Sequence, residues 1–98
     1  MAAKQEFVDR QQELLDALER DIRKLGDQAS SLAERARQGV EPEIQALETK
    51  RQILTDQLAD LRADDTETWR LVQAGFRRSV AELQDRLERA GQRARPRR

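Results

Sequence analysis

The feature that most constrains this chain is a run of mostly apolar residues that alternate at three and four positions apart. The run starts at Val8 and continues over four heptads to Ala36. Helices that wind around each other bury residues at this spacing. The run therefore predicts an amphipathic helix over about residues 4–38 with a narrow apolar stripe. The stripe consists of Val8, Gln11, Leu15, Leu18, Ile22, Leu25, Ala29, Leu32 and Ala36.

The same spacing resumes after a slip of one residue and predicts a second helix over about residues 42–63. Gly39 and Pro42 lie at the slip. Glycine often follows a helix end and proline suits a first turn, so the two residues predict a break near 39–42. A single kinked helix over 4–63 is the alternative, because Glu41 is a poor N-cap. The second stripe consists of Val40, Ile44, Leu47, Arg51, Leu54, Leu58 and Leu61.

A third stripe predicts a helix over about residues 66–90, and Asp64 with Glu67 resembles a capping box at its start. The stripe includes Trp69, the only tryptophan of the chain. Gly75 lies on its flank. A glycine inside a helix costs about 1 kcal/mol relative to alanine, so we expect a neighbouring helix to approach closely there. The third stripe consists of Trp69, Val72, Phe76, Val80, Leu83, Leu87 and Ala90.

The last residues predict a basic tail. Gly91 is expected to end the third helix, and Pro96 with four arginines follows it. We therefore expect a helical domain over 1–91 and a disordered tail over 92–98. Such a tail can contact phosphates without sequence specificity, although no aromatic residue in it can stack on bases. The candidate contacts are Arg93, Arg95, Arg97 and Arg98.

Together the stripes predict an all-α fold in which three helices pack as an antiparallel coiled coil or three-helix bundle. Disorder is the competing interpretation of a composition that is 39% charged and 37% hydrophobic. The periodicity argues against disorder for residues 4–91. At about 1.5 Å per residue, the first helix would overhang the other two. An overhanging apolar stripe needs a partner chain, so we expect a homo-oligomer.

The charges are divided unevenly along the chain. Residues 1–65 carry 10 basic and 15 acidic side chains, whereas residues 66–98 carry 9 basic and 4 acidic ones. The C-terminal third can therefore fold back on the rest of the chain or dock on a second copy. Complementarity of this kind sets orientation more than it adds stability.

Several kinds of chemistry are not supported by this sequence. It contains no histidine and no cysteine, which excludes Ser–His–Asp and Cys–His nucleophilic catalysis and thiolate metal sites. Its glycines are scattered singly, so no loop can cradle a phosphate. The carboxylates fall mostly on the solvent side of the predicted helices. We therefore expect a protein that is not an enzyme and that uses no cofactor or metal.

A cytoplasmic location is expected, because the first ten residues lack a signal-peptide apolar region and no apolar run approaches the ~20 residues that cross a bilayer. The third helix nevertheless has features of a membrane-surface helix. Arg70, Arg77 and Arg78 accompany Trp69 and Phe76 there. A weak contact with an anionic membrane is therefore a further possibility.

The segment "LADLRADDTETWRLVQAGFRRSVAEL" resembles small bacterial stress-response coiled-coil proteins, a family associated with high-light and salt stress in cyanobacteria. The resemblance spans about residues 4–90. It implies an all-α coiled coil and a role in stress response, with no catalytic residues. The matching residues are Leu15, Leu18, Ile22 and Leu25 in the first helix, Leu58, Leu61, Arg62 and Ala63 at the end of the second, and Trp69, Val72, Ala74, Gly75, Glu82 and Leu83 in the third.

Two functions follow as hypotheses. The first is a self-associating coiled-coil protein of the stress-response type, in which Leu15, Leu18, Ile22, Leu25, Ile44, Leu47, Leu54 and Leu58 pack against Trp69, Val72, Gly75, Phe76, Val80, Leu83 and Leu87. The second is a binding adaptor whose basic third helix and tail engage nucleic acid or a membrane surface. The sequence alone identifies neither the partner nor the number of copies.

Overall fold

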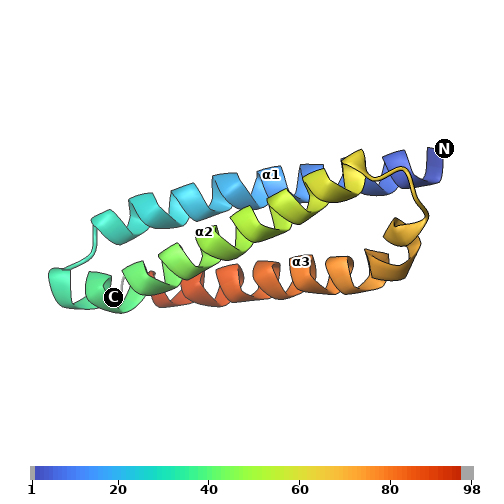
Figure 1. The fold of residues 1–98 in the computed structure, drawn as a ribbon. Coiled ribbons are helices and arrows are strands. Elements are labelled where there is room, and N and C mark those ends of the chain that lie inside the picture. The colour runs from blue at the N-terminus through green and yellow to red at the C-terminus, as the bar shows by residue number, and fades with distance from the viewer. Residues whose placement is uncertain (1, 96–98) are drawn as a thin grey trace.

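The protein folds into three long helices that lie side by side (Figure 1). The structure is a computed structural model that describes residues 2–95. Its helices are α1 (Ala2–Ser30), α2 (Glu34–Ala63) and α3 (Thr68–Arg93). α2 runs antiparallel to its two neighbours, and all three pairs of helices are in contact. The result is a rod of 52 × 19 × 17 Å, which confirms the predicted all-α three-helix fold.

The apolar stripes meet along the centre of the rod and form one continuous core. Two predicted packing residues are less enclosed: Ile44 is half-buried against the core, and Val72 is 39% exposed. Most of the predicted packing residues are buried there, namely Leu15, Leu18, Ile22, Leu25, Leu47, Leu54, Leu58, Trp69, Phe76, Val80, Leu83 and Leu87.

The chain first reverses at residues 31–33, so the predicted break near 39–42 is wrong. Here Ser30 Oγ donates a hydrogen bond of 2.7 Å to the carbonyl of Asp27. The amide of Ser31 then bonds the carbonyl three residues earlier, at 3.2 Å. Serine side chains compete for backbone groups in this way and favour helix ends over helix interiors. Although Leu32 continues the apolar spacing, it lies in the turn and only its side chain packs against the core.

Gly39 and Pro42 lie inside α2 instead of at its start. Proline removes the amide that would bond the carbonyl of Gln38, four residues earlier. Both Gln38 and Pro42 are exposed, so water can satisfy that carbonyl. A proline on the solvent side of a helix is therefore tolerated. The alternative of one helix over 4–63 is also wrong, because the chain turns ten residues before Pro42.

The earlier reversal makes the three helices nearly equal, at 29, 30 and 26 residues. No helix overhangs the others by the length predicted from the sequence. The expectation of a homo-oligomer was drawn from that overhang, so its premise is removed.

The turn between α2 and α3 is closed by side chains. Asp64 Oδ1 accepts the amide of Thr66 at 2.8 Å, and Thr66 Oγ1 accepts the amide of Thr68 at 3.2 Å. These bonds replace the predicted capping box. The carboxylate of Asp64 accepts the amide of Thr66 instead of capping the helix with Glu67, and the carboxylate of Glu67 pairs with Arg70. α3 consequently begins at residue 68 and not at 66.

α3 continues through Gly91 to Arg93, so the predicted helix end at residue 90 is wrong, whereas the predicted disorder of the tail stays a prediction. The reason for the longer helix is that Ala94 extends the stripe of Leu87 and Ala90, and it is 1% exposed. Burial of the Ala94 side chain against the core favours continuation of α3 beyond Gly91. Arg95 is exposed. The predicted contacts Arg97 and Arg98 lie outside the described residues.

Candidate interaction surfaces

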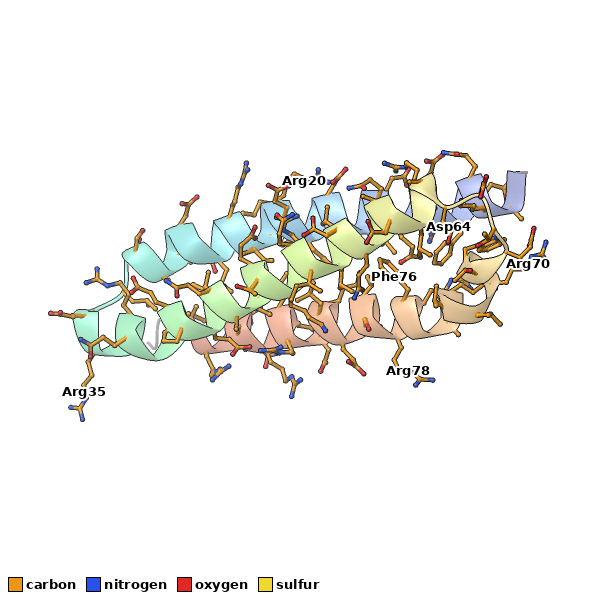
Figure 2. All side chains as sticks on the ribbon, viewed as in Figure 1. Arg20, Arg35, Asp64, Arg70, Phe76 and Arg78 are labelled. Atoms are coloured by element: carbon orange, nitrogen blue, oxygen red, sulfur yellow. The ribbon has the colours of Figure 1, made fainter. Side chains whose placement is uncertain are left out.

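An apolar groove of about 640 Å³ runs between α2 and α3. Phe76 lies at its base and points into the bundle (Figure 2), while Gly75 and Ser79 leave the α3 side low. Leu71 and Val72 stand on the same helix at 86% and 39% exposure. The groove is therefore a surface that exposes large apolar side chains to water.

Ile53 extends this surface along α2. It is 44% exposed and stands one helical turn before Gln57, which lines the groove. Residues four apart share one face of a helix. Ile53, Leu71 and Val72 are the large apolar side chains that are exposed within residues 3–95; Leu71 and Val72 line the groove, and Ile53 stands one turn from Gln57 at its α2 side. Apolar residues scattered singly need no explanation, but a cluster of them marks an interaction site.

Gly75 opens into this groove instead of meeting a neighbouring helix. A Cβ atom built on it would have no other atom within 4 Å. The predicted close approach is therefore wrong within the single chain, because the helix faces water at this point. The free-energy cost of a glycine inside α3 has no compensating contact in the described bundle.

A second surface gathers arginines at the far end of α3. Arg86, Arg89, Arg93 and Arg95 line a hollow of about 790 Å³. Arg86 Nη2 bonds Glu43 Oε1 of α2 at 3.1 Å, and Arg89 pairs with Asp85 at 2.8 Å. Arg93 and Arg95 form no ion pair with other described residues. Half of the cluster is thus neutralised, and half remains open to an anion.

The contact of Arg86 with Glu43 is the one ion pair between different helices among residues 2–95. It joins the basic C-terminal third to the acidic first part of the chain. This is one of the two contacts expected from the charge distribution, in which the C-terminal third folds back on the rest of the chain. The side chains are 39% and 24% exposed, so the pair sets orientation more than it adds stability.

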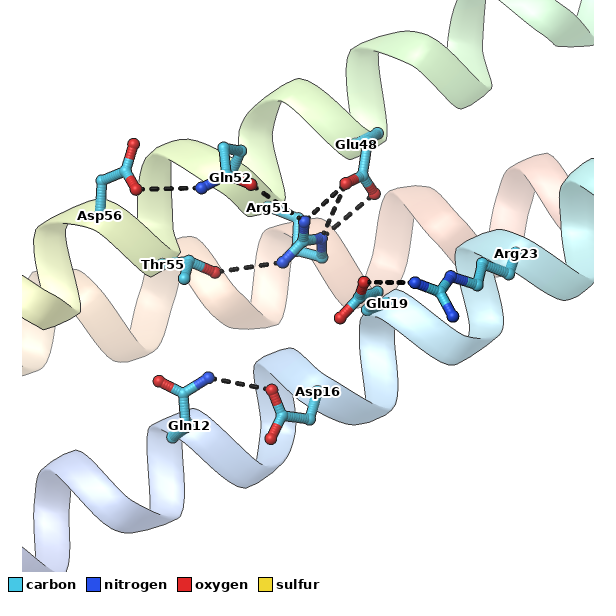
Figure 3. Close-up of polar contacts among 9 residues, drawn as sticks. All are labelled: Gln12, Asp16, Glu19, Arg23, Glu48, Arg51, Gln52, Thr55 and Asp56. Atoms are coloured by element: carbon cyan, nitrogen blue, oxygen red, sulfur yellow. Dashed lines mark hydrogen bonds and ion pairs between the residues drawn. The ribbon is translucent and has the colours of Figure 1, made fainter.

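Arg51 occupies a stripe position of α2 and is only 7% exposed (Figure 3). Its Nε bonds Glu48 Oε2 at 3.1 Å, and its Nη1 bonds Thr55 Oγ1 at 3.3 Å. The hydrogen bonding of the Arg51 guanidinium to Glu48 lowers the pKa of the Glu48 carboxyl group. Glu48, together with Glu19 and Asp16 of α1, raises the pKa of Arg51. Both shifts favour the charged forms, whereas a general acid needs the opposite shift in its carboxyl group.

Phe7 joins α1 to α3 at the end of the rod that holds Trp69. The ring centroids of Phe7 and Trp69 are 5.8 Å apart, and those of Phe7 and Phe76 are 6.0 Å apart. Arg70 covers the Trp69 ring at 5.5 Å, and Arg77 covers the Phe7 ring at 5.3 Å. The aromatic rings are therefore buried in the bundle, and the arginines lie over them.

The spacing of apolar residues does not place Phe7 in the core, because Phe7 stands one position before the stripe. Its large apolar side chain in a chain that is only 3% aromatic was the available signal.

Neither a metal site nor a membrane span is found in the described residues. Between residues 2 and 95, no three metal-ligating side chains lie together. None of the helices, as far as they are described, is long and apolar enough to cross a bilayer. No known protein family, no curated protein and no solved structure matches this chain.

Proposed function

We propose that this chain is a non-enzymatic interaction module that packs its α2–α3 face against a helical partner. One observation carries the proposal: Leu71 is 86% exposed at the edge of an apolar groove. Full burial of a leucine side chain is worth about 1.5–3 kcal/mol. A partner helix that covered Leu71, Val72 and Ile53 would gain this free energy without disturbing the closed core.

The spacing of the apolar side chains supports a helical partner. Ile53 stands one turn before Gln57 on α2 and Leu71 stands one turn before Gly75 on α3, so a partner can contact both helices through side chains one turn apart. Asp60 and Asp64 line the α2 side of the groove. Arg78, one position before Ser79, points away from the bundle near its α3 side (Figure 2). Charged residues around an apolar centre are the usual anatomy of a protein interface.

A photo-crosslinking amino acid in place of Ser79 tests this proposal in the cells that naturally express the protein. We expect light-dependent adducts at position 79, and fewer adducts when Leu71→Asp is added. The same amino acid in place of Glu13, an exposed residue of α1, is the matched control and should give none. Equal labelling at the two positions, or no adduct at position 79, would contradict the proposal.

An adaptor for an anionic partner is the second candidate, and the hollow lined by four arginines favours it. Each phosphate contact made by an arginine adds to the salt dependence of binding to duplex DNA. Binding of the intact chain to DNA and to anionic vesicles should weaken in the Arg93→Gln, Arg95→Gln variant. Arg20→Gln on α1 is the control. If the intact chain binds neither at low salt, this candidate fails.

The resemblance to bacterial stress-response proteins supports a more specific setting, a self-associating protein of the cytoplasm that responds to stress. It rests on the residues around Trp69 and on the glycine at 75. Protein levels measured during salt or high-light stress test it. Unchanged levels under both stresses would argue against this setting without affecting the interaction surface.

A further inference from the structure

We propose that the partner on the α2–α3 face is a second copy of this chain, related to the first by a two-fold axis that passes beside Gln57 and Gly75. This inference rests on the function proposed above and adds the identity of the partner. The two copies would lie face to face with their long axes antiparallel. The argument depends on how residues are distributed on either side of Gln57 and Gly75.

Gln57 and Gly75 lie at the same level of the rod. Both residues line the groove between α2 and α3, and Trp69 and Arg62 line one hollow at the α2–α3 turn. α2 and α3 are antiparallel. Gln57 stands five residues before Arg62 and Gly75 stands six residues after Trp69, so the two residues are at about the same distance along the rod from the turn. An axis crossing the groove at Gln57 therefore also passes close to Gly75.

α2 is self-complementary about Gln57. Ile53 and Leu61 stand four residues on either side of it, so a two-fold axis places Ile53 of one copy over Leu61 of the other. Lys50 and Asp64 stand seven residues on either side, about 10 Å from the axis. The axis therefore brings two apolar pairs together near the centre and two pairs of opposite charge further out, the usual anatomy of a specific interface.

α3 is complementary in shape about Gly75. Leu71 and Ser79 stand four residues on either side of it, so the bulky side chain of one copy lies over the small side chain of the other. The two glycines meet at the axis, where the absence of Cβ atoms lets the helices approach closely. This contact accounts for a glycine that faces open space in the single chain.

The other two-fold arrangement, with its axis along the groove, fits poorly. It would place α2 of one copy over α3 of the other, with residues of the same level facing each other. Val72, three residues before Gly75, would then face Asp60, three residues after Gln57, and covering a carboxylate with an apolar side chain is unfavourable. The antiparallel arrangement instead places Ile53 over Leu61, Leu71 over Ser79 and Lys50 over Asp64.

The size of the patch predicts a reversible dimer. The rod is 52 Å long and 19 Å wide, and the patch covers only part of one side. Interfaces that bury less than about 1,200 Å² in total belong to weak or transient complexes. We therefore expect the mass in solution to depend on concentration.

Sedimentation equilibrium of the whole chain tests the dimer. The mass of the wild type should rise from 11.4 kDa at low concentration toward twice that value at millimolar concentration. Leu71→Asp should weaken association at least tenfold, whereas Ala81→Asp, at an exposed α3 position outside the groove, should not. A wild type that stays monomeric, or a dimer that Leu71→Asp leaves intact, would overturn the inference.

Single cysteines locate the axis, since the native chain has none. A disulfide requires Cα atoms about 4.4–6.8 Å apart, so Gly75→Cys should form a covalent dimer in a glutathione buffer. Gly26→Cys, a helix-interior position of α1 with equally open space, is the control. Mixed Leu71→Cys and Ser79→Cys chains should also cross-link. Equal trapping of Gly75→Cys and Gly26→Cys, with no mixed product, would reject this axis.

The crosslinks at position 79 separate the two proposals. An adduct of twice the chain mass supports both of them. An adduct with a different protein, together with a monomeric wild type, would overturn the second copy as the partner and leave the interaction surface in place. Absence of any adduct would contradict both.

Discussion

Phe7 packs against Trp69 with ring centroids 5.8 Å apart, and this contact links the start of α1 to the start of α3. The two helices are separated in sequence by the whole of α2. The same end of the rod is secured by Lys4, whose Nζ donates to the backbone carbonyls of Arg62 and Asp64. The aromatic contact therefore holds the bundle closed where the N-terminus meets the second turn.

Phe7→Ala should destabilise the bundle by about 3 kcal/mol, because it removes a large buried side chain and leaves a cavity. Trp69 is only 8% exposed, so its native emission should be blue-shifted, and the variant should shift it toward the red. Leu71→Ala removes an exposed side chain and should change neither property in the monomer. Unchanged emission and stability in Phe7→Ala would contradict the packing of the two rings.

Gln11→Leu should increase the free energy of unfolding by about 1–2 kcal/mol. Gln11 is 3% exposed, and its Oε1 atom has no hydrogen-bond partner among the described residues. An unsatisfied buried polar atom costs about 1–3 kcal/mol, and leucine removes it at similar volume. Urea denaturation measures the effect. Gln12→Leu is the control and should give no gain, since Gln12 already bonds Asp16 at 2.9 Å. A less stable Gln11→Leu protein would refute this explanation.

Arg51→Leu should leave stability within about 1 kcal/mol of the wild type or increase it, because apolar residues often replace a buried ion without loss. Arg51→Ala should destabilise by about 2 kcal/mol, since the packing of the long side chain is also lost. Thermal unfolding of the two variants measures the difference. If both changes were equally damaging, the ion pair with Glu48 would be the main contribution of Arg51.

Glu48→Gln should lower stability at pH 7 and have no effect at strongly acidic pH. The hydrogen bond from Arg51 holds the pKa of Glu48 below its ordinary value of 4.5. The charged form thus stabilises the fold above pH 4.5, and this contribution disappears as the pH falls through the lowered pKa. We expect less than about 1 kcal/mol, because the Glu48 side chain is 46% exposed to solvent. A difference between the two proteins that persisted at pH 2 would contradict the assignment.

The helices and most of the core are predictable from the spacing of apolar residues, but the first turn is not. The spacing runs through Leu32 and Ala36, so it gives no sign that the chain reverses between them. Ser30 and Ser31 carry the local signal, because serine favours helix ends. Gly39 and Pro42 are stronger punctuation on average, yet α2 tolerates both on its solvent side.

The interaction surface is predictable only in part. Leu71 lies off the apolar stripe of α3, and this alone indicates an exposed leucine. Its meaning depends on α2, which brings Ile53 and Leu61 to the same face. That juxtaposition depends on how α2 is rotated against α3, and the spacing within one helix does not determine it.

Small-angle X-ray scattering combined with light scattering over a dilution series tests the central claim most directly, namely a closed three-helix bundle that uses its α2–α3 face. Extrapolated to zero concentration, we predict a mass of 11.4 kDa and a radius of gyration close to 15.8 Å. The mass should increase with concentration in the wild type but not in Leu71→Asp. A single helix over residues 4–63, about 90 Å long, would give a far larger radius at all concentrations and would contradict the account.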